Sequence, residues 1–399
     1  MVQNSRTLFT FNSNYRMKRL CIKFGLFSMP LILIFLPAVY HLESYRELDS
    51  ISEMAYSNQS NGALIGLAYT DPMHLVKHEV LEVRQPEIIA LGSSRVLSFR
   101  GFVYSEPSLF YNCGRSVGKV QDMKSFLSSY PGQKPKIILL GLDQDFFGIE
   151  DRDLDRTPRS YLTQESTYGD RLIKGTKALF DAVKEGEIEI GVTLTEASSF
   201  MGRNARLHHE GYRQDGSYIY GRKLRDAEED DYSFSSTMKR INKRKGRFAP
   251  ADKIHPGAVR ELAEFVELCH ENEIHVVAFL PPYANKVFKR LEEERSKFPH
   301  VFDLHTELHP IFNRHRFKLF DFADLKLVGS NDYETHDGFH ASETAYLKLI
   351  GIMAGQDSVL SGVLNKPEME NMLGDQHSAR QVIEEIEETH PKIPSPINR

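Results

Sequence analysis

The sequence has little cysteine and no long basic segment, and each shortage excludes a class of protein. Only three cysteines occur in 399 residues, and their spacing matches no metal-binding pattern. Cys21 borders an apolar segment, so at most Cys113 and Cys269 pair, and two buried free thiols are the simpler expectation. The net charge of −5 argues against nucleic-acid binding. We therefore expect no bound metal, no cofactor and no nucleic-acid partner.

Acidic residues are missing from the N-terminal segment, while basic ones are frequent there. Residues 24–40 carry no charge and, with their flanks, approach the roughly 20 residues that cross a bilayer. Five basic residues precede this run, and the acids Glu43, Glu47 and Asp49 follow it. The positive-inside rule predicts cytoplasmic residues 1–23, a single membrane span and an exported main domain. A cleaved signal peptide is the alternative, but no clear small-residue cleavage pattern follows the run.

The remaining chain, 41% hydrophobic and 26% charged overall, alternates short apolar runs with helical patterns. Continuous apolar runs are typical of parallel strands buried on both faces. Five such runs occur, at Pro86–Leu91, Leu109–Cys113, Lys136–Leu142, Ile274–Leu280 and Phe317–Phe322. Helical patterns occur at Val117–Tyr130, Pro256–Asn272, Asn285–Phe298 and Ala341–Gly355. This alternation predicts an α/β fold with a three-layer, doubly wound parallel sheet of five strands.

Three segments lie outside this alternation. Residues 41–83 are predicted to be a juxtamembrane segment. Residues 150–252 separate the two parts of the core, 84–149 and 253–364, and such a long excursion predicts an insertion over the site. Its basic cluster at 239–245 is either a solvated helix face or a contact for an anionic polymer or lipid. Residues 365–399 are acidic and Pro-punctuated, which predicts a poorly ordered tail.

Two distant motifs contain the parts of a Ser-His-Asp triad. Leu91-Gly92-Ser93-Ser94-Arg95 directly follows the first apolar run, and Asp337-Gly338-Phe339-His340 precedes the last helical pattern. A serine hydroxyl becomes a nucleophile when an imidazole that is oriented by a carboxylate takes its proton. Asn112-Cys113-Gly114-Arg115-Ser116 ends the second run and offers backbone donors for an oxyanion. Because loops at the carboxyl ends of parallel strands share one edge, we expect these residues to meet.

These motifs resemble the SGNH (GDSL-like) hydrolase superfamily over about residues 84–148 and 253–355. The resemblance implies that Ser94 is the nucleophile, that Gly114 is the second-block glycine, and that Asp337 and His340 form the last block. The Gly-Ser-Ser variant, the anchor and Gly141-Leu142-Asp143 are similar to membrane-anchored cell-envelope members linked to teichoic-acid or polysaccharide acylation. The implied function is a serine esterase or acyltransferase that acts on acyl esters of a cell-surface polysaccharide or envelope polymer. The alternative is a non-catalytic subunit that partners an integral-membrane O-acyltransferase.

The chain departs from the family pattern in its first and third blocks. Ser93 stands where the first block has Asp, and Gly141 to Asp145 lacks the Asn that usually donates to the oxyanion. Either Gln144 substitutes for it, or backbone donors from Ser94 and Gly114 suffice, or the activity is weak. Arg95 and Arg115 are candidates for binding a substrate phosphate or carboxylate, and surface ion pairs are the alternative for both.

Structural roles compete with the catalytic ones. Ser94 is also a suitable helix N-cap, and His340 could cap or pack, with His336 beside it as a second candidate. Asp143 and Asp145 are expected to be structural acids at a strand end. A metal site from His336, Asp337 and His340 lacks any further ligand in the sequence.

Overall fold

The computed structural model divides into two compact units, which are described separately. Within the large unit lie residues 50–67, 71–165 and 197–399; within the small unit lie 1–49, 68–70 and 166–196. The structure describes residues 7–148, 158–161, 167–186, 199–225, 232–374 and 378–382, without the side chains of 7–14, 16, 30–34 and 225.

The large unit is an α/β structure with a five-stranded, all-parallel sheet in the order β3-β2-β4-β8-β9. Its strands are β2 (Ile88–Gly92), β3 (Phe110–Gly114), β4 (Ile137–Gly141), β8 (His275–Leu280) and β9 (Lys318–Asp321). Each predicted strand is confirmed, with bounds within two residues of the expected ones. The carboxyl ends of β2 and β3 are in register, with Gly92 opposite Gly114.

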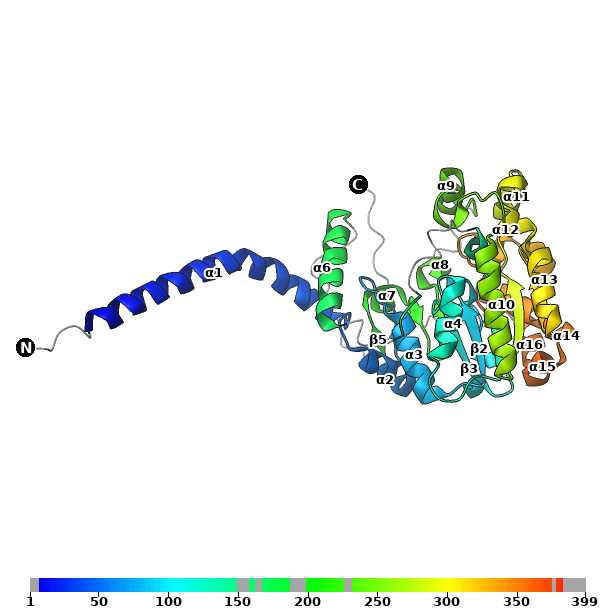
Figure 1. Ribbon diagram of the computed structural model, residues 1–399, viewed down its shortest axis with the longest axis horizontal. Coiled ribbons are helices and arrows are strands. Elements are labelled where there is room, and N and C mark those ends of the chain that lie inside the picture. Colours follow the sequence, from blue (N-terminus) through cyan, green and yellow to red (C-terminus); the bar gives the residue numbers. More distant parts are fainter. Residues whose placement is uncertain are drawn as a thin grey trace, which may run out of the picture. The chain divides into compact units, whose positions relative to one another are not determined.

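Alternate residues of the strands face two separate hydrophobic clusters. Ile89 and Leu91 lie in a cluster with side chains of α4 (Val120–Ser128), α10 (Pro256–Glu271) and α13 (Leu304–Arg314). Ile88 and Ala90 lie in the other, with α14 (Glu343–Gln356), α15 (Ser358–Val363) and α16 (Lys366–Gly374). Figure 1 shows α4 and α10 across the near face of the sheet. Burial on both faces explains the continuous apolar runs.

The predicted helices in and around the core are confirmed with small changes of bounds. α11 (Asn285–Glu292) is shorter than predicted and is followed by the 3₁₀ turn η8 (Arg295–Lys297). α10 begins at Pro256, a residue that suits the first helical position because it has no N–H to leave unpaired. The His255 ring accepts hydrogen bonds from the next turn.

The segment 41–83 is more than a connection, because its second half builds part of the core. It contains α2 (Ile51–Asn61), β1 (Leu64–Ile65) and α3 (Met73–Arg84). β1 joins a small mixed sheet, in the order β5-β1-β6-β7, with β5 (Phe200–Met201), β6 (Gly211–Tyr212) and β7 (Tyr218–Ile219). Part of the predicted insertion is therefore fixed to the segment that precedes the large sheet.

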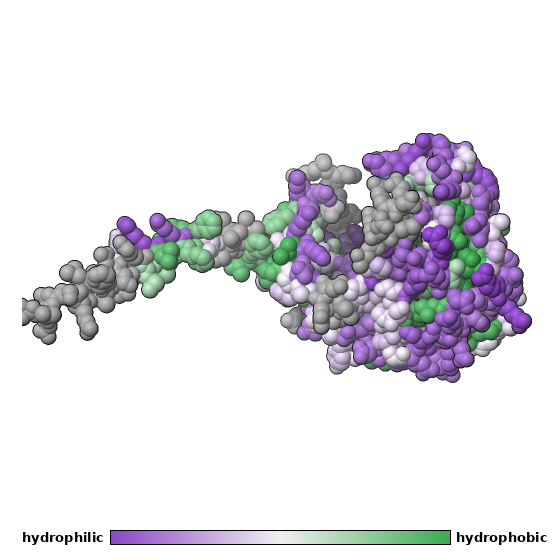
Figure 2. Space-filling view, viewed as in Figure 1, coloured by the Kyte–Doolittle hydropathy of each residue, from purple (hydrophilic) through white to green (hydrophobic). Residues whose placement is uncertain are grey.

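The small unit pairs α1 (Thr7–Ser44) with α6 (Tyr168–Lys184). Ala38 and Leu42 of α1 share a cluster with Leu179 of α6, so this part of the predicted insertion packs on the N-terminal helix. Figure 2 shows apolar side chains along α1, and those of Leu20 and Phe27 are exposed. Among the residues described, none of the helices has both the length and the apolar character that a bilayer crossing requires.

The predicted disordered tail is wrong for its described residues. α16 contributes Met369 to the second core cluster, and Val382 is buried in the same cluster. Arg380 is buried and lies over the Tyr232 ring. Apolar residues in an otherwise acidic segment therefore hold the chain to the core, while residues 383–399 lie outside the described part.

The expectation of two buried free thiols is confirmed for Cys113 and Cys269, whereas Cys21 is exposed and also free. Cys113 lies on β3 and Cys269 on α10. Both belong to the cluster on one face of the sheet, where a thiol packs as a small hydrophobic group.

Candidate active site

Ser94 is presented to solvent by a turn that buries everything around it. Between residues 88 and 101 it is the one residue that is not buried. It begins the 3₁₀ turn η1 (Ser94–Val96), and Ser93 caps that turn by accepting a hydrogen bond from the Arg95 amide. The N-cap role that competed for Ser94 is therefore filled by Ser93, and the Ser94 hydroxyl is left for other contacts.

The three predicted triad side chains form one hydrogen-bonded chain. Ser94 Oγ lies 2.9 Å from His340 Nε2, and His340 Nδ1 lies 2.9 Å from Asp337 Oδ2. With its proton on Nδ1 the ring donates to Asp337, and Nε2 is then free to accept the serine proton. Burial opposes the charge of Asp337, but His340 and the hydrogen bonds from it hold the pKa of this carboxyl far below its usual value. This is the geometry of an activated serine nucleophile.

The loop that carries Asp337 and His340 is fixed by backbone contacts. Asp337 Oδ1 accepts the N–H groups of Phe339 and His340 at 2.9 and 2.8 Å. Gly338 has φ +80°, and a Cβ there would lie 2.7 Å from Phe234, so this turn requires glycine. Thr237 Oγ1 donates to the Asp337 carbonyl at 2.9 Å. The acid and the base are thus held in one rigid turn.

Tyrosines in and just after the small sheet reach the histidine of the predicted triad, His340. The Tyr212, Tyr218 and Tyr220 rings follow one another with centroids 4.8 Å apart. Tyr220 then stacks on His336 at 4.2 Å and lies 5.7 Å from the His340 ring. Burial lowers the pKa of His336 to about 3, so this histidine is a neutral packing group, and His340 is the histidine that contacts Ser94. The predicted insertion therefore contributes one wall of the site.

The predicted oxyanion donors are engaged elsewhere. The Gly114 amide donates to Asn112 Oδ1 at 2.8 Å, and Asn112 Nδ2 donates to the carbonyls of Val96 and Phe99. Gln144 Nε2 donates to the Pro281 carbonyl at 2.9 Å. These contacts brace the strand ends, and they occupy the Gly114 amide, both N–H groups of Asn112 and one N–H of Gln144. In the described part of the chain, the Ser94 amide makes no hydrogen bond, so it is the predicted donor that is left.

The two predicted substrate arginines differ in their surroundings. Arg95 is buried; it donates to Gln144 at 2.6 Å and to the Pro281 and Pro282 carbonyls at 2.8 Å. The Tyr283 and Phe339 rings flank its guanidinium. Arg95 therefore ties the turn after β2 to the end of β8, and the structure gives it no access to substrate.

Arg115 keeps an accessible charge beside the nucleophile turn. Its amide donates to the Ser93 carbonyl at 3.1 Å, and its guanidinium pairs with Asp71, each side chain being almost half exposed. Such an exposed pair contributes at most about 1 kcal/mol, so a ligand anion can replace the aspartate. Its backbone has φ +66°, which costs a non-glycine residue roughly 1–2 kcal/mol. Of the two arginines, Arg115 is the one whose charge a ligand can reach.

Arg247 and Lys77 belong to the site, although no motif marks them. Arg247, in the 3₁₀ turn η7 (Gly246–Phe248), donates to Asp143 Oδ2 at 2.8 Å and lies 3.3 Å from Asp145. Lys77 of α3 is fully buried, and its Nζ donates at 2.8 Å to three backbone carbonyls, those of Asn112, Gly114 and Gly216. Only the fold brings these two cations to the strand ends.

Asp145 makes the stability of the site dependent on pH. Burial, with Arg247 opposing it and Asp143 adding to it, raises the pKa of Asp145 to about 6 from an ordinary 3.8. The folded state therefore holds a proton that the unfolded state has lost between these values, and stability falls as the pH rises through that window. We compare the free energy of unfolding of Asp145→Asn with that of wild type at two pH values. We expect this difference to shift in favour of the variant by about 3 kcal/mol from pH 3.5 to pH 7. Urea unfolding at both pH values measures this gain, and an equal difference at both would contradict it.

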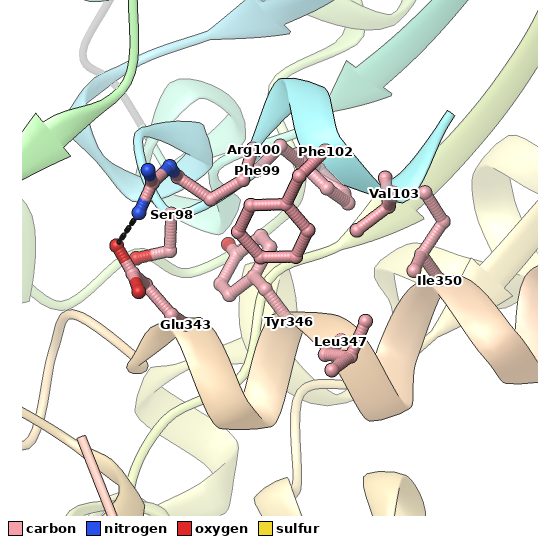
Figure 3. A pocket seen from close by; sticks show the side chains of 9 residues that line it. All are labelled: Ser98, Phe99, Arg100, Phe102, Val103, Glu343, Tyr346, Leu347 and Ile350. Carbon is pink, nitrogen blue, oxygen red and sulfur yellow. Dashed lines mark hydrogen bonds and ion pairs between the residues drawn. The ribbon is translucent and has the colours of Figure 1, made fainter. Parts of the chain in front are cut away.

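A small hollow lies between the chain after η1 and α14. Figure 3 shows its largely apolar lining, which includes Phe102, Val103 and Ile350. Arg100 and Glu343 close one end with an ion pair of 2.7 Å. Because Arg100 and Glu343 neutralise each other, this hollow offers no free charge to a ligand and does not belong to the candidate site.

Comparisons with known proteins add no assignment: no family model, no curated protein and no solved structure matches this chain. Within the described residues, no group of three or more His, Cys, Asp or Glu side chains is placed to hold a metal ion.

Proposed function

We propose that this protein is an SGNH-like serine esterase or acyltransferase with the site at the carboxyl edge of a doubly wound sheet. The observation that supports it most is the continuous hydrogen-bonded chain from Ser94 through His340 to Asp337. Ser94 attacks an acyl carbonyl while His340 takes its proton and Asp337 stabilises the imidazolium. His340 then returns the proton to the leaving alcohol. Water, or the hydroxyl of an acceptor, finally removes the acyl group from Ser94.

The proposed substrate is an acyl ester of a cell-surface polysaccharide or envelope polymer. The basic N-terminus followed by the apolar run 24–40 supports a single-pass anchor with the main domain outside the cytoplasm. The side chains of residues 30–34 lie outside the described set, so this anchor stays a proposal. Arg115 and the tyrosine wall that ends at Tyr220 suit a sugar polymer that bears anionic groups.

A second candidate is a non-catalytic subunit of the same fold that partners an integral-membrane O-acyltransferase. The occupied donors of Gly114 and Gln144 favour it, because they leave fewer groups for an oxyanion. The intact Ser94–His340 contact favours the enzyme, since a scaffold needs no activated hydroxyl.

Covalent labelling separates the two candidates. The full chain in detergent is treated with a fluorophosphonate, and peptide mass spectrometry locates the adduct. We expect one adduct, on Ser94, which an added acyl ester suppresses and which Ser94→Ala abolishes. Ser98→Ala is the matched control, because this buried serine only donates to the Ala341 carbonyl. A folded wild-type chain that stays unlabelled would rule out the enzyme.

A further inference from the structure

A buried carboxylate lies next to the nucleophile turn, where a reaction intermediate would develop negative charge. Asp143 is fully buried, and its Oδ2 accepts a hydrogen bond of 2.5 Å from Ser93, the residue before Ser94. Its Oδ1 has no hydrogen-bond partner in the described part of the chain. A negative group at this position repels the oxyanion that forms from the acyl carbonyl oxygen, unless a cation accompanies it.

Arg247 supplies a cation at this place. Its Nη1 is the nitrogen that contacts Asp143 and Asp145. Its guanidinium also lies 5.3 Å from the ring of Phe339, the residue before His340. Among the described residues, no hydrogen bond uses its Nε or Nη2, and the side chain is about one third exposed. A guanidinium carries five N–H donors in a rigid plane, so Arg247 can hold Asp143 and still donate to a ligand.

The other nearby arginines do not meet these conditions. Arg95 is buried and already donates to three acceptors. Arg115 pairs with Asp71, not with the carboxylate behind the nucleophile turn. Arg240 lies over the same Phe339 ring at 5.8 Å, but no ion pair joins it to Asp143 among the described residues.

We propose that Arg247 donates to the oxyanion of the acyl-transfer reaction, together with the Ser94 amide; this rests on the proposed function. As Ser94 Oγ bonds to the acyl carbon, the carbonyl π electrons move onto the oxygen and His340 takes the hydroxyl proton. Arg247 keeps its protons and stabilises the new charge. When the carbonyl re-forms, the bond to the alcohol breaks and His340 protonates the leaving oxygen. The charged Arg247 thus takes the place of the uncharged Asn amide that donates to the oxyanion in the family pattern, and Asp143 fixes the position of Arg247.

The test compares Arg247→Gln with wild type in p-nitrophenyl acetate hydrolysis by the full chain in detergent. Glutamine keeps a polar N–H donor on a shorter side chain and removes the charge. We expect kcat to fall about 10²- to 10³-fold, as for loss of an oxyanion donor, with KM changed less than threefold. The rate of fluorophosphonate labelling should fall in parallel. Arg240→Gln is the matched control, from the same segment and over the same ring, and should keep wild-type kcat.

An Asp143 carboxylate that has lost Arg247 can itself destabilise the chain and so lower kcat. A second pair of variants tests Arg247 without this effect. Asp143→Asn is compared with Asp143→Asn/Arg247→Gln, because neither variant buries a carboxylate at this position. We expect the double variant to have at least a tenfold lower kcat. Equal kcat in this pair, with wild type labelled at Ser94, would overturn the role of Arg247 and leave the proposed function standing. A wild-type chain that is neither labelled nor active would overturn both.

Discussion

Ser94→Ala should lower the turnover of an acyl ester by about 10⁴-fold or more, and adding His340→Ala to it should lower the rate little further. The two side chains act as one unit, because the hydroxyl is activated only through its 2.9 Å contact with the imidazole. Steady-state kinetics of the two single variants and the double variant measure this. Independent, multiplying losses would mean that His340 does not serve Ser94.

Asp337→Asn tests the third member while it keeps size and shape. The amide oxygen can still accept the N–H groups of Phe339 and His340, so the turn should stay folded. What is lost is the charge that stabilises the imidazolium, and we expect about 10²- to 10⁴-fold lower kcat. Asp332→Asn is the control from the same loop, because Asp332 accepts the Asn285 amide at the start of α11. A larger loss in Asp332→Asn would reassign the orienting acid.

The sheet and the triad could be predicted because their signals are local. A strand buried on both faces reads as a continuous apolar run, and each run ended within two residues of the observed strand. Only Ser93 separates Ser94 from the end of β2, and Asp337 and His340 lie three residues apart on one turn. Parallel strands bring their carboxyl ends to one edge whatever the loop lengths are, which places Ser94 beside a loop more than 240 residues away.

The small sheet could not be predicted, because its strands are only two residues long. β1 (Leu64–Ile65) has no periodicity to read and is stabilised by pairing with residues more than 130 positions later. Segment 41–83 therefore appeared as a connection, although α3 buries Val76 and Val80 against the large sheet. Pairing between β-strands leaves no recognisable pattern in the sequence when the paired stretch is only two residues long.

The roles of the polar residues at the strand ends depend on partners that no motif contains. Asn112 folds back on the Gly114 amide and so removes a donor that sequence position alone would offer. Arg95 is enclosed by two aromatic rings from distant loops, which turns a candidate surface arginine into a structural one. Side-chain direction, and not residue type, decides between binding a substrate and bracing a turn.

Lys77 shows how the same edge is held together from behind. Its ammonium joins the end of β3 to the loop after β6 by donating to the carbonyls of Asn112, Gly114 and Gly216. Burial lowers the pKa of Lys77 to about 7, because the enclosed ammonium loses its hydration. The three carbonyl acceptors compensate for part of that loss. Arg115 follows Gly114 directly, so this contact also holds the backbone beside Arg115.

Lys77→Met should therefore destabilise the large unit by about 2–4 kcal/mol, because a side chain of similar length leaves three buried carbonyls without a donor. That is a large share of the roughly 5–15 kcal/mol that stabilises a typical domain. Urea unfolding monitored by circular dichroism measures the loss. Lys136→Met is the matched control, since the Lys136 side chain is largely exposed and, among the described residues, pairs only with Glu87; it should stay within about 0.5 kcal/mol of wild type. A Lys77→Met variant as stable as this control would mean that the three carbonyls find other donors, and that other contacts join the end of β3 to the loop after β6.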